Sequence, residues 1–278
     1  MDILTRSATL RDRLKVWRAA GMKIALVPTA GTLHKGHLSL VAEAQERADR
    51  VVVSIFAGLQ ERDGSRNEAD RDLLHKVGPD IVFAPPVQEL YPFGTDLSAS
   101  VDIPQLGKLF EGAHAPGHIA EGLTLLLKLL NLVGPDFVMF GERDFQQLVS
   151  VRQMVNDLFI PIEIVACPTL RESDGLALAT ANRMLTAAQR SAAPLFYATL
   201  SRIAKRIDGG ERDYAALEQQ GLDALAAAGF RCEYFAIRQS ADLAPVRAAS
   251  RDLVVIAAAQ LGAVRLTDNL RVRVIDRF

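Results

Sequence analysis

Short apolar runs alternate with segments of helical periodicity through the first part of the chain. The runs are rich in Val and Ile and lie at residues 23–27, 51–56, 80–84, 136–140 and 162–165. They are continuous rather than alternating with polar residues, which is typical of parallel strands buried on both faces. Strands that alternate with helices predict a Rossmann-like, doubly wound α/β domain, which we place at residues 1–172.

The pattern changes after residue 172. Thr186 followed by Gln189 is a capping-box signature, and it predicts a long amphipathic helix that runs to about residue 207. A second helix is predicted over 214–228, followed by two strands near 232–237 and 252–258. These elements predict a smaller C-terminal α+β domain at 173–278, which we expect to act as a lid.

Composition narrows the classes of function. Of the 278 residues, 49% are hydrophobic, the net charge is −1 and only 6% are aromatic. Such a chain offers neither the charge nor the stacking surfaces expected for a nucleic-acid partner. No apolar stretch approaches a membrane span, and the N-terminus has no apolar signal-peptide core. Cys167 and Cys232 stand far apart, so we expect a cytoplasmic protein with no metal cluster of its own.

The most specific chemistry follows the first of these runs. The run leads through Pro28 and Thr29 into residues 30–37, here called the histidine turn, where His34 and His37 lie three positions apart. A helix that begins near Gly36 would present unpaired N–H groups and a positive dipole end to an anion. Imidazoles there could bind phosphate and stabilise the charge that grows as pyrophosphate leaves. The alternative is that both histidines cap the helix or face solvent.

A longer set of motifs resembles one family. The chain is similar to the pantothenate synthetases, the ATP-dependent pantoate–β-alanine ligases, within the nucleotidylyltransferase superfamily. The resemblance rests on motifs at residues 28–40, 110–118, 131–136, 140–147, 168–177 and 268–270. These motifs occur in order along essentially the whole chain, so the resemblance is more specific than the paired histidines alone.

The resemblance implies a two-step reaction. Pantoate would attack ATP to give pantoyl adenylate and pyrophosphate, and β-alanine would then displace AMP. It also implies ATP and Mg²⁺ as cofactors, small-molecule substrates (a hydroxy acid, an amine and ATP), and a homodimer. Because carboxylate attack on ATP brings anions together, hydrogen-bond donors and Mg²⁺ must neutralise the charge.

The resemblance also implies roles for individual residues. The catalytic candidates are His34, His37 and Arg143. The expected nucleotide contacts are Ala30, Gly31, His34, Gly36, His37, Gly141, Arg143, Asp144, Pro168, Thr169, Leu170 and Thr180. The expected contacts to the hydroxy acid are Pro28, Thr29, Gln60 and Gln147. From the residues alone, Asp144 could equally cap a helix and Gln147 could be solvated.

Several positions depart from the family pattern near the substrates. Ala30 and Gly58 stand where the family usually has Met and Asn, and the loop after the second strand is shorter. Gln60 is therefore either a shifted substrate contact or an exposed loop residue. Ala120 and Glu121 replace an arginine-containing stretch, which exchanges a cation for a carboxylate.

Other departures fall on the expected phosphate contacts. Arg143 replaces a lysine, and Ala179 and Ala181 stand where a serine and an arginine are usual. Thr180 keeps a hydroxyl, and Arg183 could supply a cation two residues further on. Three functions remain open: a pantothenate synthetase with compensating residues, an adenylate-forming ligase for another acid or amine, or a non-catalytic nucleotide-binding relative.

Overall fold

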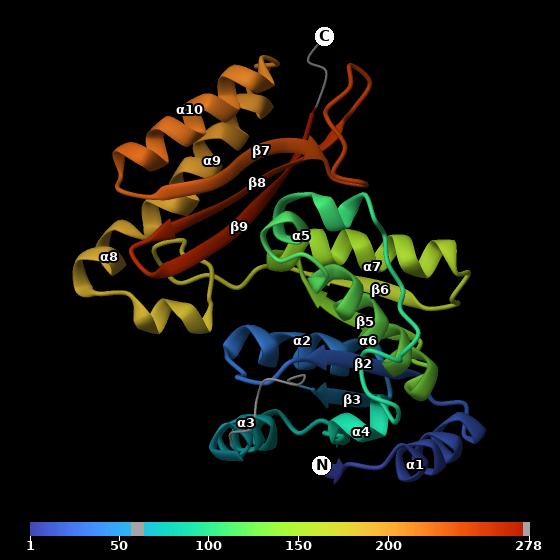
Figure 1. Cartoon of the computed structure of the whole chain (residues 1–278). Helices are drawn as coiled ribbons and strands as arrows, with labels where there is room; N and C mark the ends of the chain where they lie inside the picture. The colour runs from blue at the N-terminus through green and yellow to red at the C-terminus, as the bar shows by residue number, and fades with distance from the viewer. Residues whose placement is uncertain (57–63, 275–278) are drawn as a thin grey trace. The chain divides into compact units, whose positions relative to one another are not determined.

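The structure, a computed structural model, describes residues 1–56 and 64–274. It divides into two compact units (Figure 1). The first unit comprises Met1–Gly141 and Ser150–Pro168, and the second comprises Glu142–Val149 and Thr169–Phe278. The predicted boundary after residue 172 lies in the same stretch of chain, and the independence of two domains remains a prediction.

The first unit is built on a parallel sheet. Among the described residues this sheet has six strands in the order β1-β4-β3-β2-β5-β6. The strands are β1 (Asp2–Leu4), β2 (Ile24–Thr29), β3 (Arg50–Ile55), β4 (Ile81–Phe83), β5 (Phe137–Gly141) and β6 (Glu163–Cys167). The predicted doubly wound fold is therefore confirmed, and the short edge strand β1 was not predicted.

Both faces of this sheet are covered. The apolar side of α2, with Leu40 and Val41, packs on Ala25 and Val27 of β2. Leu26 alternates to the opposite face and is also fully buried, as continuous apolar runs require. The helices of the chain up to residue 157 are α1 (Ser7–Ala19), α2 (Lys35–Arg47), α3 (Gly64–Val77), α4 (Val87–Leu90), α5 (Phe110–His114), α6 (His118–Val133) and α7 (Phe145–Asp157). Short 3₁₀ turns lie at η1 (Leu106–Lys108) and η2 (Glu142–Asp144).

The strand order creates a switch point at the centre of the sheet. From β2 the chain proceeds to β3 on one side, whereas β5 lies on the other. The pairing of β2 with β3 continues to Thr29, but its pairing with β5 stops at Leu26 and Val138. In open α/β sheets, ligands bind beyond the carboxyl ends of the strands at such a point. The histidine turn and the end of β5 border it.

The second unit contains an antiparallel sheet of β7 (Arg231–Gln239), β8 (Asp252–Leu261) and β9 (Val264–Arg273). Helices α9 (Pro194–Asp208) and α10 (Tyr214–Ala227) lie along one face (Figure 1). The core between them joins Phe196 and Leu200 of α9 to Phe235 of β7 and Val255 of β8. The smaller α+β region is therefore confirmed.

Two details of this region were predicted wrongly. The capping box at Thr186 and Gln189 is present, but its helix α8 (Ala187–Ala192) ends before Pro194, which begins α9. Proline has no N–H for the next helical hydrogen bond and clashes with the preceding turn, so one long helix cannot form. Strand β9 was missed as well, because Asp268 and Asn269 interrupt its apolar alternation.

Candidate active site

Several predicted site residues of the first unit lie at one edge of the parallel sheet. Pro28 and Thr29 end β2, Gly141 ends β5, and Pro168 directly follows β6. These strands are parallel, so their carboxyl ends lie at the same edge. The Thr29 hydroxyl donates to the backbone oxygen of Ser54 at 2.8 Å, which leaves its oxygen as an acceptor.

The two histidines cap helix α2. His34 is the N-cap residue, and its Nδ1 accepts from the Gly36 N–H at 3.1 Å. His37 Nδ1 accepts from the His34 N–H at 3.2 Å, and the ring centroids lie 4.1 Å apart. A Cβ at Gly36 would lie 2.8 Å from the His34 ring, so a larger residue here would displace the capping imidazole. The sequence-based alternative of capping is therefore what the structure shows.

Capping also determines what each imidazole can offer a ligand. An Nδ1 atom that accepts a hydrogen bond carries no proton, so in the neutral ring the proton is on Nε2. His34 and His37 thus each have an Nε2–H donor, and both imidazoles sit at a helix N-terminus where the dipole favours an anion. Capping uses Nδ1 of each ring, so this arrangement is compatible with the predicted phosphate contact through Nε2.

Asp70 of α3 supports the histidine turn and was not identified from the sequence. Its Oδ2 and Oδ1 accept from the N–H groups of Thr32 at 2.8 Å and Leu33 at 2.7 Å. The Asp70 residue is 3% exposed, and Thr32 adopts a left-handed φ of 53°. This conformation is costly for a β-branched residue. Two hydrogen bonds to a buried carboxylate stabilise it and fix the backbone just before His34.

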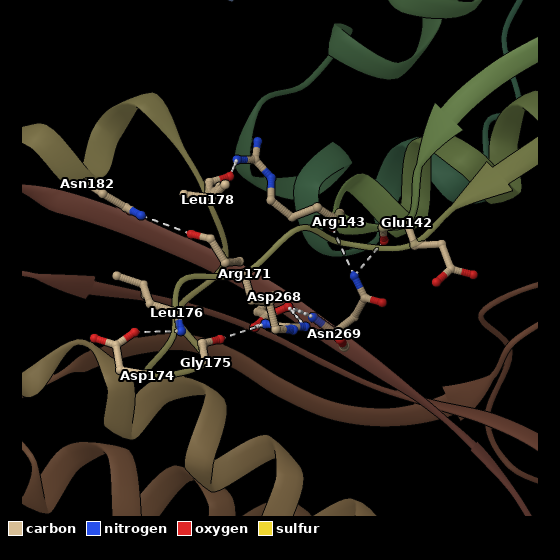
Figure 2. Close-up of polar contacts among 11 residues, drawn as sticks. Glu142, Arg143, Arg171, Asp174, Gly175, Leu176, Leu178, Asn182, Asp268 and Asn269 are labelled. Atoms are coloured by element: carbon tan, nitrogen blue, oxygen red, sulfur yellow. Dashed lines mark hydrogen bonds and ion pairs between the residues drawn. The ribbon is translucent and has the colours of Figure 1, made fainter. Parts of the chain in front are cut away.

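In the second unit, Arg143 connects two predicted nucleotide-binding segments (Figure 2). Its Nη1 donates to the backbone oxygen of Leu178 at 3.1 Å. The Leu178 N–H in turn donates to the oxygen of Leu170 at 2.9 Å. The Arg143 guanidinium also lies 3.3 Å from Asp144 Oδ1. The second unit therefore brings residues 143–144, 170 and 178 together.

Strand β9 contributes two buried polar residues to the same network. Asn269, which is 5% exposed, donates from Nδ2 to the backbone oxygens of Glu142 and Arg143 at 2.8 and 2.9 Å (Figure 2). Asp268 forms an ion pair with Arg171 at 2.5 Å. Burial raises the pKa of the Asp268 carboxyl, while the Arg171 guanidinium opposes that rise.

The remaining predicted residues occupy varied positions. Gln147 is exposed on α7, whereas its neighbour Gln146 is 1% exposed. Thr180 begins the 3₁₀ turn η3 (Thr180–Met184), and Arg183 is exposed on that turn. Gln60 and Gly58 lie outside the described residues. The contacts of these residues with substrates stay predictions.

Comparison with known proteins decides the family. The model of the pantoate-beta-alanine ligase family matches residues 2–271. The chain belongs to this family. Curated relatives named pantothenate synthetase include one from Pseudomonas putida strain GB-1, which is 45% identical over 97% of both chains. Another, from Nitrosococcus oceani, is 40% identical over 98% of both chains.

Solved structures of the family agree with this fold. The pantothenate synthetase of Thermus thermophilus matches with a TM-score of 0.84 and 37% identity, over 97% of this chain and 99% of that chain. The pantoate-beta-alanine ligase of Francisella tularensis matches with a TM-score of 0.74 and 28% identity, over 97% of each chain. That structure is a complex with beta-gamma ATP and β-alanine.

Proposed function

We propose that this chain is an ATP-dependent ligase that joins pantoate to β-alanine. A carboxylate oxygen of pantoate attacks the α-phosphorus of ATP, a P–O bond forms, and pyrophosphate leaves with the electrons of the broken bridging bond. The β-alanine nitrogen then attacks the acyl carbon of pantoyl adenylate. A C–N bond forms, the acyl C–O bond breaks, AMP leaves, and the amine loses a proton to solvent.

The observation that carries this proposal is the capped histidine pair in a chain of this family. The two Nδ1 atoms accept backbone N–H groups at 3.1 and 3.2 Å, so the proton of each neutral ring is on Nε2. Donors aimed at charge that develops in the transition state are the typical means of stabilising a leaving oxyanion. We assign His37 the main catalytic contact and His34 a supporting phosphate contact.

The other predicted residues take complementary roles in the proposal. Ala30, Gly141, Arg143 and Asp144 contact the nucleotide, and Gly31 and Gly36 allow close backbone approach. Pro168, Thr169 and Leu170 line the adenine, and Thr180 supplies a hydroxyl to the phosphates. Pro28, Thr29, Gln60 and Gln147 contact the hydroxy acid in this proposal.

Magnesium enters this proposal together with ATP. In the part of the chain that the structure describes, no group of three or more His, Cys, Asp or Glu side chains is suited to hold a metal ion. Mg²⁺ commonly takes most of its ligands from substrate phosphates and water, so the chain fits a metal that arrives bound to ATP. When bound, the ion would neutralise charge on the phosphates.

The state of the protein in the cell belongs to the same proposal. We propose a cytoplasmic homodimer, as the family resemblance implies, and light scattering on the purified protein tests the dimer. Among the described residues, no helix is both long and apolar enough to cross a bilayer.

A substrate panel tests the function directly. The purified protein is incubated with ATP, Mg²⁺, pantoate and β-alanine, and AMP and pyrophosphate are measured. We expect release of both in equal amounts with pantothenate formation. Release only with other acids or amines would favour an adenylate-forming ligase with different substrates. The change of charge at Ala120 and Glu121 is the reason to test this alternative. ATP binding without any release would favour a non-catalytic relative.

A further inference from the structure

We propose that Asp268 and Asn269, the β9 pair, are positioning residues that hold Arg143 for nucleotide binding. The inference rests on the proposed function, since it concerns the ATP end of that site. Neither residue was given a role by sequence reasoning beyond its place in a motif. The structure instead shows both of them buried, with Asn269 directed to the segment that carries Arg143 and Asp268 directed to Arg171 (Figure 2).

The Asn269 side chain donates hydrogen bonds to backbone oxygens of the Arg143 segment, which we define as residues 142–144. A carboxamide nitrogen has two N–H donors. Nδ2 uses both, one to the oxygen of Glu142 at 2.8 Å and one to the oxygen of Arg143 at 2.9 Å. These oxygens belong to a 3₁₀ turn of three residues, Glu142–Asp144. So short a turn has few internal hydrogen bonds, and the contact from β9 therefore fixes its orientation.

Asp268 fixes Asn269 in turn. Its Oδ1 accepts from the Asn269 N–H at 2.8 Å, and its two oxygens accept from the Arg171 guanidinium at 2.5 and 2.9 Å. Arg171 also donates to the oxygen of Gly175 at 3.1 Å and lies 4.0 Å from the centroid of the Tyr197 ring. A bidentate, buried pair of this kind has a defined geometry. It connects β9 to the loop that leads to Leu178.

The two ends of Arg143 are therefore held separately. Its backbone oxygen is bound by Asn269, and its Nη1 donates to Leu178 in the segment that the Asp268–Arg171 pair supports. A guanidinium has five N–H donors in a planar fork. Contacts with Leu178 and Asp144 leave donors for phosphate oxygens, in an orientation that the β9 pair fixes. Preorganised donors bind an anion without a further ordering cost.

A double-mutant cycle on ATP binding tests this inference. Asn269→Leu, Arg143→Ala and the double variant are compared with the full-length wild type by calorimetry with ATP and Mg²⁺. Loss of hydrogen bonds of ordinary strength at Asn269 corresponds to roughly tenfold weaker binding. We expect this loss in the wild-type background and little further loss in the Arg143→Ala background, because Asn269 acts through Arg143.

Leu266→Ala is the matched control. Leu266 lies on the same strand, is 4% exposed and belongs to the core under β9. Its truncation lowers the melting temperature, and we expect the ATP affinity to stay within twofold of wild type. If Asn269→Leu does not fold, Asn269→Ser, which keeps a small polar side chain, takes its place in the cycle with the same expected non-additivity.

The outcomes separate this inference from the proposed function. Equal losses from the Asn269 substitution in both backgrounds, or none in either, would overturn the positioning role. A protein that binds ATP and shows the cycle, yet releases no AMP with pantoate and β-alanine, would contradict the proposed function alone. No ATP binding by the wild type at millimolar concentration would overturn both.

Discussion

The histidine turn and the Arg143 segment differ in how far along the chain their supporting contacts reach. The histidines are held by hydrogen bonds between residues two and three positions apart, and by Asp70 at a separation of 38 positions from Thr32. The Arg143 segment is held by Asn269 at separations of 127 and 126 positions. Local contacts thus support the histidine turn, and a long-range contact supports the Arg143 segment.

This difference teaches where substitutions can be tolerated. The histidine turn contains its own capping interactions at the start of α2, and only its backbone at Thr32 and Leu33 needs a contact from another helix. The backbone oxygens of Glu142 and Arg143 are instead bound by Asn269 of β9, so the geometry of this segment depends on a distant strand. We therefore expect substitution of Asn269 on β9 to affect nucleotide binding although Asn269 is not a predicted nucleotide contact.

The largest expected effect separates capping from catalysis in the histidine turn. Glutamate or glutamine at the third helical position is the usual partner in a capping box, so His37→Glu keeps the cap and leaves no N–H donor at this position. We expect the melting temperature to change little, and the rate of adenylate formation to fall roughly 10²–10³-fold. Near-normal activity of this variant would show that His37 only caps α2.

The next largest effect concerns Arg143 and Arg183, the two arginines that could supply the cation that the family usually has at position 181. Arg143 is held at Leu178 O, whereas Arg183 is exposed on η3. Loss of a charge-assisted contact weakens binding roughly 10- to 150-fold. We therefore expect kcat/KM for ATP to fall by this factor in Arg143→Ala. Arg183→Ala should change it less than threefold. Steady-state kinetics with varied ATP measure both, and the reverse order would assign the compensation to Arg183.

A smaller effect, on stability, concerns Asp70. An asparagine there has one acceptor oxygen for the N–H groups of Thr32 and Leu33, and its amide group faces the other donor. We expect Asp70→Asn to lower the free energy of unfolding by about 1–3 kcal/mol. Urea unfolding measures this change, with Asp72→Asn, an exposed residue of the same helix, as the control. Equal stability of the two variants would contradict the supporting role of Asp70.

The smallest expected effect is a pH-dependent contribution of Asp174 to the free energy of unfolding. The Arg190 guanidinium, 2.6 Å from Asp174, holds the pKa of that carboxyl below its usual value. A depressed pKa in the folded state stabilises the protein at neutral pH, and this contribution is lost as the pH falls through the folded pKa. We expect Asp174→Asn to cost at most about 1 kcal/mol at pH 7, since the pair is partly exposed.

Unfolding of Asp174→Asn and wild type at pH 7 and at acidic pH checks the sign of this effect. The difference between the two proteins should shrink once Asp174 is protonated in both states. A difference that grows on acidification would rule out the ion pair as its source.

The sequence by itself determined the doubly wound sheet, the family, and the histidine turn, because strand periodicity, glycine positions and helix capping act over a few residues. It also indicated the capping box at Thr186. It did not reveal the break at Pro194 within an apolar pattern, nor β9, whose buried Asp268 and Asn269 look like loop residues.

Only the tertiary structure decided what supports the site. Asp70 and Asn269 bind backbone N–H and C=O groups, which carry no side-chain signature in the sequence. Their partners lie tens of residues away or more, so no local pattern relates them. Burial makes these bonds effective, because a buried polar group without a partner is costly, and burial is set only when the sheets and helices pack.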